Sequence, residues 1–370
     1  MPVPALTRSR RLRETPFSRR VDAAGATAYT CYNHMLLATS FGDMQEECRH
    51  LKSAVQVWDV SCERQVEIRG GDAGRLVQML TPRDLRPMTP GQCYYTPMVD
   101  QTGGMLNDPV TLKLAEDRFW VSIADSDLLF WVNGLALGLR LEVDILEPDI
   151  CPLAVQGPLA EELMARVFGE RVRRIRFFRF DWLEFGGRQL VVARSGYSKQ
   201  GGFEIYVDGE RSFAESLWDA LFEAGRDLDV RAGCPNLIER IEGRLLSYGN
   251  DMTRENTPHE CGLGRFCHTR IALGCIGRDA LLRVAVEGPV RQIRSFAIDG
   301  APLSPCTSDW SIEADGKRVG RITSCAWSPD FGTNVAIGMI RLSHWDDGTR
   351  VAVKTPEGRR RATVRVAPFT

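Results

Sequence analysis

The segment from Arg194 to Val207, which reads R-S-G-Y-S-K-Q-G-G-F-E-I-Y-V, constrains the fold most. Its glycines mark a turn, and the residues after the turn alternate between polar and apolar types. Because side chains alternate between the two faces of a strand, Glu204 and Tyr206 share one face, and the branched and aromatic residues share the other. The chain therefore contains a strand with one core face and one face that is either solvated or lines a pocket.

The overall composition is that of an ordinary globular protein. The chain has 370 residues, with 44% hydrophobic and 26% charged residues, and fits two or three domains. A net charge of −1 shows no excess of basic residues of the kind that indicates nucleic-acid binding. The longest apolar stretch, Leu128–Leu139, is too short to span a bilayer. The arginine-rich N-terminus is not followed by an apolar run, so we expect no secretory signal and no membrane partner.

Eleven cysteines are scattered along the chain without the spacing of a disulfide framework. This usage is typical of a reducing compartment, so we expect a cytoplasmic protein. One cluster, formed by His259, Cys261, Cys267 and His268, contains metal-ligating residue types. It lacks a C-x-x-C pair and a regular finger spacing, so we expect no metal.

Strand and helix patterns alternate irregularly, which indicates an α+β fold without a βαβ repeat. Short strands are predicted at Val66–Ile68 and Val110–Leu114. A helix is predicted over Leu159–Phe168, between a proline and a glycine. A second helix is predicted from Ser212 to Gly225, where Ser212 and the residue three positions later form a capping box.

After about residue 255, short apolar runs separated by Gly, Pro and Asp predict an all-β module. The runs are Leu281–Val286, Ser295–Ile298, Arg318–Ile322, Val335–Ile340, Val351–Lys354 and Ala362–Val366.

The Arg194–Val207 segment resembles the R-T-G-Y-T-G-E-x-G-[FY]-E-I signature of the folate-dependent aminomethyltransferase family, which includes the T-protein of the glycine cleavage system. Other motifs of this family occur in the same order. They are W-D-V-S at 58–61, Y-Y-T-P-M-V-D at 94–100, G-G-M-L-N-D at 103–108, L-A-V-Q-G-P at 153–158, R-I-E-G at 240–243 and Y-G at 248–249. The resemblance therefore covers most of the chain.

Several stretches are more similar to one branch of the family, the tetrahydrofolate-dependent dimethylsulfoniopropionate demethylases. They are R-L-R at 11–13, T-P-F at 15–17, Y-N-H-M-L-L at 32–37, S-G-Y-S-K-Q-G-G at 195–202, P-N-L-I-E-R-I-E at 235–242 and Y-G-N-D-M at 248–252.

The family's architecture is three domains in a ring around a central folate channel, with a C-terminal β-barrel-like domain. Transferred to this chain, the resemblance implies a folate-binding α+β domain at residues 1–66 and 150–253. It also implies an inserted α+β domain at 67–149 and the barrel-like domain at 254–370.

The resemblance also implies roles for individual residues. Asp108 matches the acidic residue that lies beside folate N5, and Glu204 matches the carboxylate that binds the pterin ring. Tyr95 and Tyr197 match folate-contacting tyrosines, and Tyr206 shares the strand face of Glu204. Without the resemblance, Asp108 is better explained as a turn residue, and each tyrosine is equally consistent with a core residue.

A sulfonium donor is attracted to aromatic ring faces. Candidates for this pocket are Tyr32, Trp182, Phe178 and again Tyr206. A donor carboxylate needs a cation or backbone donors, and the candidate side chains are His34, Lys199 and Arg194.

Three departures from the family pattern separate the chain from lipoyl-dependent aminomethyl transfer. Asn236 occupies the place of the arginine that contacts the folate tail, so we retain it as a neutral cofactor-binding candidate. Asn107 replaces the first acidic residue of D-D. The loop S-K-Q at 198–200 replaces T-G-E.

The resemblance therefore implies methyl transfer from dimethylsulfoniopropionate to tetrahydrofolate, which yields methylmercaptopropionate and 5-methyltetrahydrofolate. Three alternatives stay open. They are a T-protein-like aminomethyltransferase, a folate-dependent demethylase of another onium or methoxy substrate such as a betaine, and a folate-binding protein without activity. The sequence also leaves a homodimer open.

Overall fold

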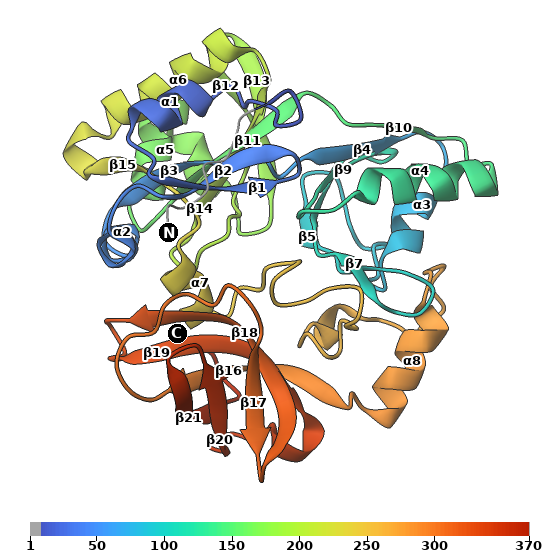
Figure 1. Cartoon of the computed structure of the whole chain (residues 1–370). Helices are drawn as coiled ribbons and strands as arrows, with labels where there is room; N and C mark the ends of the chain where they lie inside the picture. The colour runs from blue at the N-terminus through green and yellow to red at the C-terminus, as the bar shows by residue number, and fades with distance from the viewer. Residues whose placement is uncertain (1–8, 370) are drawn as a thin grey trace.

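The computed structural model describes residues 9–369, which form three lobes around a common centre (Figure 1). Strands and helices are mixed in the first two lobes, and the third is built around a barrel. The expected α+β class and the C-terminal barrel are thus confirmed. Within residues 9–369, no helix combines the length and apolar character needed to cross a bilayer.

The first lobe is built on a six-stranded sheet in which only the β15–β3 pair is parallel. In sheet order the strands are β12 (Phe180–Phe185), β13 (Arg188–Ala193), β14 (Gly202–Asp208), β11 (Ile150–Gln156), β3 (Val55–Asp59) and β15 (Val230–Gly233). Helices α5 (Ala160–Phe168) and α6 (Arg211–Ala224) pack on one face. The predicted helix over 159–168 is therefore confirmed to within one residue.

Strand β14 has the two faces that its sequence predicts. Phe203, Ile205 and Val207 are buried in the core between the sheet and helices α5 and α6. Glu204 and Tyr206 are buried on the opposite face, toward the centre of the molecule. That face is not a solvated one, so Glu204 is held inside the protein.

The start of α6 differs from the prediction. The residue that caps the helix is Glu210, and no side chain makes a capping hydrogen bond there. The Ser212 hydroxyl instead donates a hydrogen bond of 2.7 Å to the Glu210 carboxylate. The helix begins two residues earlier than the capping-box pattern indicates, because the Ser212 hydroxyl bonds to the acidic residue before the helix and not to the helix backbone.

The second lobe contains a five-stranded sheet made from the segment between β3 and β11. Its strands, in sheet order, are β10 (Asp144–Leu146), β4 (Gln65–Arg69), β9 (Arg118–Ser122), β8 (Val110–Ala115) and β5 (Cys93–Tyr95). Helices α3 (Ala73–Leu80) and α4 (Leu128–Leu139) pack against it. The predicted strands at 66–68 and 110–114 correspond to β4 and β8.

The third lobe is a closed barrel of six strands. Around the barrel they are β16 (Arg291–Ile298), β19 (Thr333–Arg341), β18 (Lys317–Ser328), β17 (Trp310–Ala314), β20 (Arg350–Thr355) and β21 (Gly358–Arg365). Five of the six predicted apolar runs lie in these strands. The run Leu281–Val286 does not, because it forms helix α8 (Arg278–Glu287) between two glycines. A short apolar run does not distinguish a strand from a helix, and that prediction was wrong.

The remaining elements are short. They are α1 (Ser18–Ala23), β1 (Ala28–Tyr32), β2 (Met35–Ser40), α2 (Met44–Leu51), β6 (Met98–Val99), β7 (Met105–Asn107) and α7 (Leu237–Glu242). The 3₁₀ turns among the described residues are η1 (Glu170–Arg174), η2 (Arg226–Leu228), η3 (Gly264–Phe266) and η4 (Leu342–His344).

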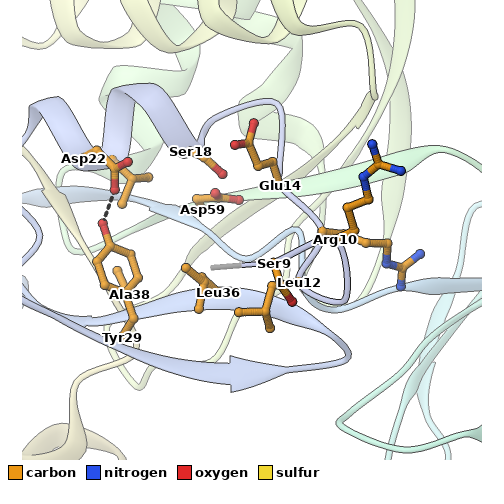
Figure 2. A pocket seen from close by; sticks show the side chains of 12 residues that line it. Ser9, Arg10, Leu12, Glu14, Ser18, Asp22, Tyr29, Leu36, Ala38 and Asp59 are labelled. Atoms are coloured by element: carbon orange, nitrogen blue, oxygen red, sulfur yellow. Dashed lines mark hydrogen bonds between the residues drawn. The ribbon is translucent and has the colours of Figure 1, made fainter. Parts of the chain in front are cut away.

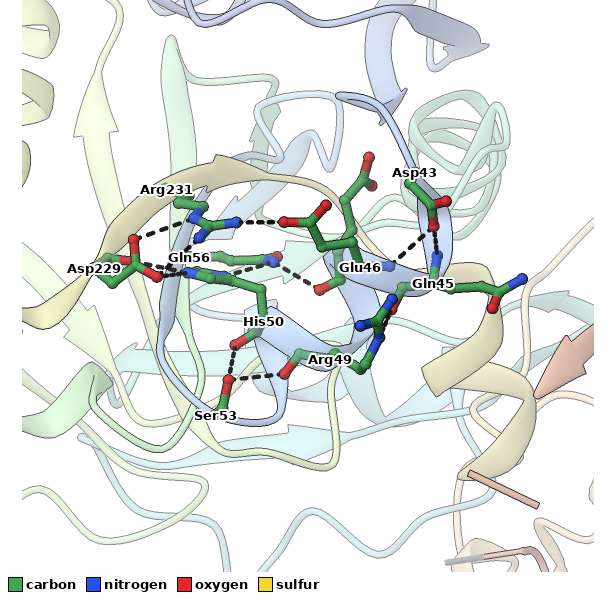
Figure 3. A network of polar contacts seen from close by, with 10 residues as sticks. Asp43, Gln45, Glu46, Arg49, His50, Ser53, Gln56, Asp229 and Arg231 are labelled. Atoms are coloured by element: carbon green, nitrogen blue, oxygen red, sulfur yellow. Dashed lines mark hydrogen bonds and ion pairs between the residues drawn. The ribbon is translucent and has the colours of Figure 1, made fainter. Parts of the chain in front are cut away.

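A polar network fixes α2 against β15 (Figure 3). The Asp43 side chain caps α2 by accepting hydrogen bonds from two backbone N–H groups of its first turn. Arg231 pairs with Asp229 at 3.0 Å and with Glu46 at 3.2 Å. The His50 ring lies 2.8 Å from the Asp229 carbonyl oxygen. These contacts lie at the periphery of the first lobe and hold its edge strand in place.

Candidate active site

The loop before β14 is held by Gln156, from the L-A-V-Q-G-P motif. The Gln156 amide donates to the Ser195 and Phe203 carbonyl oxygens at 3.2 and 3.4 Å, and accepts a 2.8 Å hydrogen bond from the Ser198 hydroxyl. A Cβ on Gly202, whose φ is +152°, would lie 2.2 Å from the Val155 carbonyl oxygen. The glycine is required because the loop packs directly on strand β11, and this packing sets the start of β14.

Glu204 projects from β14 into the centre of the molecule. Its carboxylate accepts a hydrogen bond from the Ser195 hydroxyl, from the other side of the same loop. Burial raises the pKa of Glu204, and the hydrogen bond from Ser195 opposes that rise. The next side chain on this face, Tyr206, is also buried and lies 5.7 Å, between ring centroids, from Trp120.

Asp108 lies between β7 and β8, where the Tyr95 hydroxyl donates a hydrogen bond of 2.8 Å to its carboxylate. Burial raises the pKa of Asp108 to about 7, against the effect of that hydrogen bond. The neighbouring Asn107 is fully buried, and its amide bonds to the Ala124 backbone and the Ser126 hydroxyl. Asn107, which stands where the family has its first acidic residue, therefore has a structural role: its hydrogen bonds anchor the backbone next to Asp108.

The structure adds a residue that the sequence analysis missed, Glu63. It follows the W-D-V-S motif in the turn between β3 and β4, and it is half-buried. Burial raises the pKa of Glu63 well above its usual value, and the charges of Glu204 and Asp108 raise it further. The signal that could have identified it is a carboxylate two residues after a motif that carries the resemblance.

Glu63, Asp108 and Glu204 together form a carboxyl cluster in the centre of the molecule. Within residues 9–369, none of the three forms an ion pair with a Lys, Arg or His side chain. Arg240, the cation of the R-I-E-G motif, is instead paired with Asp251 at 2.9 Å. The cluster therefore has an excess of acceptors, and it suits a ligand that brings N–H donors or a positive charge.

Tyrosines surround the carboxyl cluster. Tyr32, at the end of β1, has a pKa raised well above its usual value by burial first and then by negative groups that include Glu63 and Asp108. The Tyr197 hydroxyl hydrogen-bonds to the Leu245 and Leu246 carbonyl oxygens at 3.1 and 2.8 Å. Both side chains are half-buried, so neither belongs to a fully buried core.

The other donor-pocket candidates differ in burial and in their place in the fold. Phe178 packs in the apolar group that contains Tyr206, and its backbone has a φ of +58°. Trp182 shares that sheet face through the register Trp182–Val191–Tyr206, but it lies at the sheet edge and is 39% exposed. His34 is exposed in the turn between β1 and β2, two residues from Tyr32.

The Asn236 side chain is committed to structural contacts. It caps α7 by accepting from the Ile238 and Glu239 N–H groups at 3.0 and 3.2 Å, and its amide donates to the Met44 carbonyl oxygen at 3.0 Å. The proposed folate contact of Asn236 stays a prediction. Arg194 pairs with Glu161 at 2.7 Å, whereas the exposed side chains of Lys199 and His34 form no ion pair within residues 9–369.

A separate pocket of about 330 Å³ lies between the N-terminal segment, the β1–β2 hairpin and Asp59 (Figure 2). Tyr29 donates a hydrogen bond to Asp22 at its wall. None of the residues that line it belongs to the carboxyl cluster or to the tyrosines around that cluster. This pocket is therefore distinct from the candidate active site.

The described part of the chain contains no group of three or more His, Cys, Asp or Glu side chains placed to hold a metal ion. All eleven cysteines are free thiols. Burial raises the pKa of Cys267 to about 12, so this thiol stays protonated near neutral pH.

Comparisons with known proteins agree with this fold. The GCVT N-terminal domain model matches residues 17–270, and the glycine cleavage T-protein C-terminal barrel domain model matches residues 291–370. The crystal structure of glycine cleavage system aminomethyltransferase T from Bartonella henselae superposes with a TM-score of 0.87 at 23% identity, and covers 97% of this chain and 98% of that one. That structure shares the fold.

Two relatives match most of this chain in sequence. Dimethylsulfoniopropionate demethylase DmdA of Ruegeria pomeroyi is 59% identical over 357 residues, which is 96% of this chain and 97% of that protein. An aminomethyltransferase of Clostridium botulinum is 30% identical over 329 residues, which is 86% of each chain. On this evidence of matching domains, identity and coverage, the chain belongs to the aminomethyltransferase family of the glycine cleavage T-protein.

Proposed function

We propose that this protein transfers a methyl group from the sulfonium of dimethylsulfoniopropionate to N5 of tetrahydrofolate. The products are methylmercaptopropionate and 5-methyltetrahydrofolate. The carboxyl cluster carries this proposal, because a buried group of three acceptors without a cation suits both a pterin with N–H donors and an onium ion. The 59% identity to a protein named dimethylsulfoniopropionate demethylase supports the same substrate.

The reaction needs positioning more than activation of the donor. The N5 lone pair forms a bond to the methyl carbon while the bond between that carbon and sulfur breaks. The electron pair of the broken bond stays on sulfur, which becomes a neutral thioether. Holding the two reactants in line and away from water can supply about 7–11 kcal/mol of the barrier in well-oriented systems. The half-buried side chains of Tyr32 and Tyr197, whose pKa values are both raised by burial and by the charges of Glu63 and Asp108, support such a place beside the carboxyl cluster.

Asp108 is the proposed proton acceptor. The positive charge moves from sulfur to N5, and the N5 proton must then leave. A carboxylate with a pKa of about 7 is ionised in part at neutral pH and is basic enough to receive that proton. Tyr95 positions the Asp108 carboxylate by its hydrogen bond.

Glu204 is the proposed pterin ligand. Its ionised carboxylate accepts hydrogen bonds from ring N–H and amino groups, and Ser195 fixes the orientation of that carboxylate. Tyr95, Tyr197 and Tyr206 provide aromatic surface for the flat folate rings. On the donor side, Tyr32, Phe178 and Trp182 offer ring faces, and His34 lies near enough in sequence to Tyr32 to meet the donor's carboxylate.

A direct assay tests the proposal. Purified protein is incubated with tetrahydrofolate and dimethylsulfoniopropionate, and both products are quantified by mass spectrometry. Parallel reactions offer glycine betaine and an aminomethylated lipoyl carrier, because relatives at 30% identity are named aminomethyltransferases. Turnover of betaine alone, or of the lipoyl carrier alone, would assign another donor, and folate binding without turnover would refute the activity.

The division at residues 66, 149 and 253, the cytoplasmic location, the absence of a metal and a homodimer stay predictions. The chain leaves the six-stranded sheet after β3 and returns to it with β11, which supports an inserted second domain.

A further inference from the structure

Helix α4 (Leu128–Leu139) is apolar on every side, and none of its 12 residues is charged. One side, which contains Val132 and Ala136, is buried in the core of the second lobe. The helix lies at the outer edge of that lobe (Figure 1), and its other side carries Phe130 and Leu137 with exposed fractions of 72% and 79%. A helix that is apolar all round is normally covered on both sides, but residues 9–369 leave this one half uncovered.

Two glycines lie on the same exposed side of the helix. Gly134 and Gly138 are four residues apart, so together with Phe130 and Leu137 they form one continuous surface, the outer face of α4. Neither glycine has a positive φ, and a Cβ on either would meet no atom within 4 Å.

The described chain therefore gives no reason for glycine at these two positions. Alanine fits there and favours a helix more than glycine does. A second helix packed on the outer face would explain both glycines, because small side chains let two helices approach closely.

The charges at the two ends of α4 indicate which helix fits. Asp127 precedes the first residue of α4 and Arg140 follows the last. Both side chains are exposed, and neither forms an ion pair in the part of the chain that the structure describes. An antiparallel helix with a cation at its C-terminal end and an anion at its N-terminal end complements both charges.

The helix α4 of a second copy has these properties. Asp127 and Arg140 lie almost equally far on either side of Gly134, so an antiparallel pair centred there places the acidic end of each helix beside the basic end of the other. The same arrangement places Phe130 of each copy opposite Gly138 of the other. The pattern is self-complementary, as a two-fold symmetric interface requires.

A membrane surface fits this helix less well. Helices that lie in a membrane interface carry Lys or Arg beside their apolar side, and residues 128–139 contain neither. The anionic Asp127 at one end would also face the anionic lipid headgroups.

We propose that the outer face of α4 is the interface of a homodimer, in which two copies of this helix pack antiparallel across a two-fold axis. None of its residues belongs to the carboxyl cluster, so each copy keeps its own candidate active site. The interface is therefore independent of the proposed function.

The first test measures the mass of the full chain in solution. Light scattering after gel filtration is expected to give about twice the chain mass of 41.4 kDa, and sedimentation equilibrium gives the Kd of the dimer. Leu137→Glu places a charge at the centre of the interface, and we expect it to raise that Kd at least about tenfold. Val286→Glu is the matched control, because Val286 is 73% exposed on helix α8, and we expect a change of less than about twofold.

A charge reversal tests the antiparallel arrangement itself. Asp127→Arg brings like charges together at both ends of the pair, and we expect the dimer Kd to rise at least about tenfold. Adding Arg140→Asp to Asp127→Arg restores opposite charges, and we expect the Kd to return to within about threefold of the wild-type value. Circular dichroism of each variant distinguishes dissociation from unfolding.

Several results would overturn the proposal. One is a wild-type chain that stays monomeric at every concentration. Another is a dimer whose Kd changes with neither Leu137→Glu nor Asp127→Arg, because its interface would then lie elsewhere. A monomer that binds vesicles of phosphatidylcholine and phosphatidylserine, and loses that binding with Leu137→Glu, would assign the outer face of α4 to a membrane surface.

Discussion

The Tyr95 hydroxyl donates a 2.8 Å hydrogen bond to the Asp108 carboxylate, and this contact joins strand β5 to the turn that follows β7. The bond stabilises the ionised form of Asp108, whereas burial favours the protonated form and raises its pKa to about 7. Tyr95 therefore decides how much of the proposed base is available at neutral pH.

Removing that hydroxyl is expected to shift the pH dependence of turnover. In Tyr95→Phe, the pKa of Asp108 rises further, so the ionised base appears only at higher pH. A hydrogen bond to a charged group contributes about 1.5–3 kcal/mol, so we expect the acid limb of the kcat profile to move up by about one unit or more. Tyr248→Phe is the control, because that hydroxyl donates to the Met105 carbonyl oxygen at 3.1 Å, and its acid limb should stay in place.

Replacing the proposed base itself should separate chemistry from binding. Asp108→Asn keeps the size of the side chain but cannot receive the N5 proton. Loss of a positioned acid or base lowers rates about 10²- to 10⁴-fold, and we expect single-turnover methyl transfer to fall by that order. The folate Kd should change less than about threefold. Unchanged single-turnover rates would remove Asp108 from the mechanism.

The same substitution should alter stability in a pH-dependent way. The folded pKa of Asp108, about 7, lies above its unfolded value, so folded protein holds a proton that the unfolded chain releases. The stability linked to that proton is complete below about pH 4 and is lost as the pH rises through about 7. Asp108→Asn should therefore be more stable than wild type above pH 7, by up to about 4 kcal/mol, and nearly equal to it at acid pH.

Urea unfolding at pH 4, 6 and 8 measures this difference. For Asp43→Ala we expect the opposite pH dependence of the stability difference from wild type, because N–H groups of Glu46 and Gln45 lower the pKa of Asp43. Its contribution to stability is present above the usual pKa of an aspartate and is lost as the pH falls. A pH-independent difference for Asp108→Asn would show that Asp108 has an ordinary pKa.

Glu204 is expected to control the affinity for folate. Glu204→Gln places an amide where the pterin requires an acceptor, and leaving buried N–H donors unpaired costs about 1–3 kcal/mol. We expect the tetrahydrofolate Kd to rise at least about tenfold in a fluorescence titration. Glu184→Gln changes an exposed carboxylate on the same sheet and should leave the Kd unchanged. Superimposable titrations of the two variants would exclude Glu204 as a folate ligand.

The buried pair of Arg240 and Asp251 is expected to hold the first lobe to the barrel. Arg240 donates to the Asp251 carboxylate at 2.9 Å and to the Ser324 hydroxyl at 2.8 Å. Removing one partner leaves a buried charge, so Asp251→Asn should lower the free energy of unfolding by about 3–5 kcal/mol. Arg231→Gln disrupts the exposed network of Figure 3, and we expect a loss of about 0–1 kcal/mol in the same denaturant titration.

Strand β14 was predictable from its sequence, because a period of two residues assigns its side chains to two faces without knowledge of the rest of the chain. Helix α8 was not, since the apolar run 281–286 fits a strand and a helix equally well. The start of α6 was misplaced for a similar local reason, because Glu210 competes for the Ser212 hydroxyl.

Glu63 shows the limit of motif reasoning at the site. Asp108 and Glu204 lie in segments that resemble family signatures, so the sequence identifies both as candidates. Glu63 follows its motif without belonging to it, and only the tertiary fold brings its carboxyl group toward the other two. The Asn236 side chain, in contrast, is engaged in capping α7, which no motif indicates.

The sequence by itself determined the family, the α+β class, the barrel and the two faces of β14, because these depend on local periodicity and on motifs that are continuous along the chain. Only the tertiary structure decided that Glu63, Asp108 and Glu204 meet without a cation. They come from positions as far apart as 63 and 204 in the chain, and their shared burial raises the pKa of each. Proximity and desolvation are properties of the packed chain, and no single segment contains them.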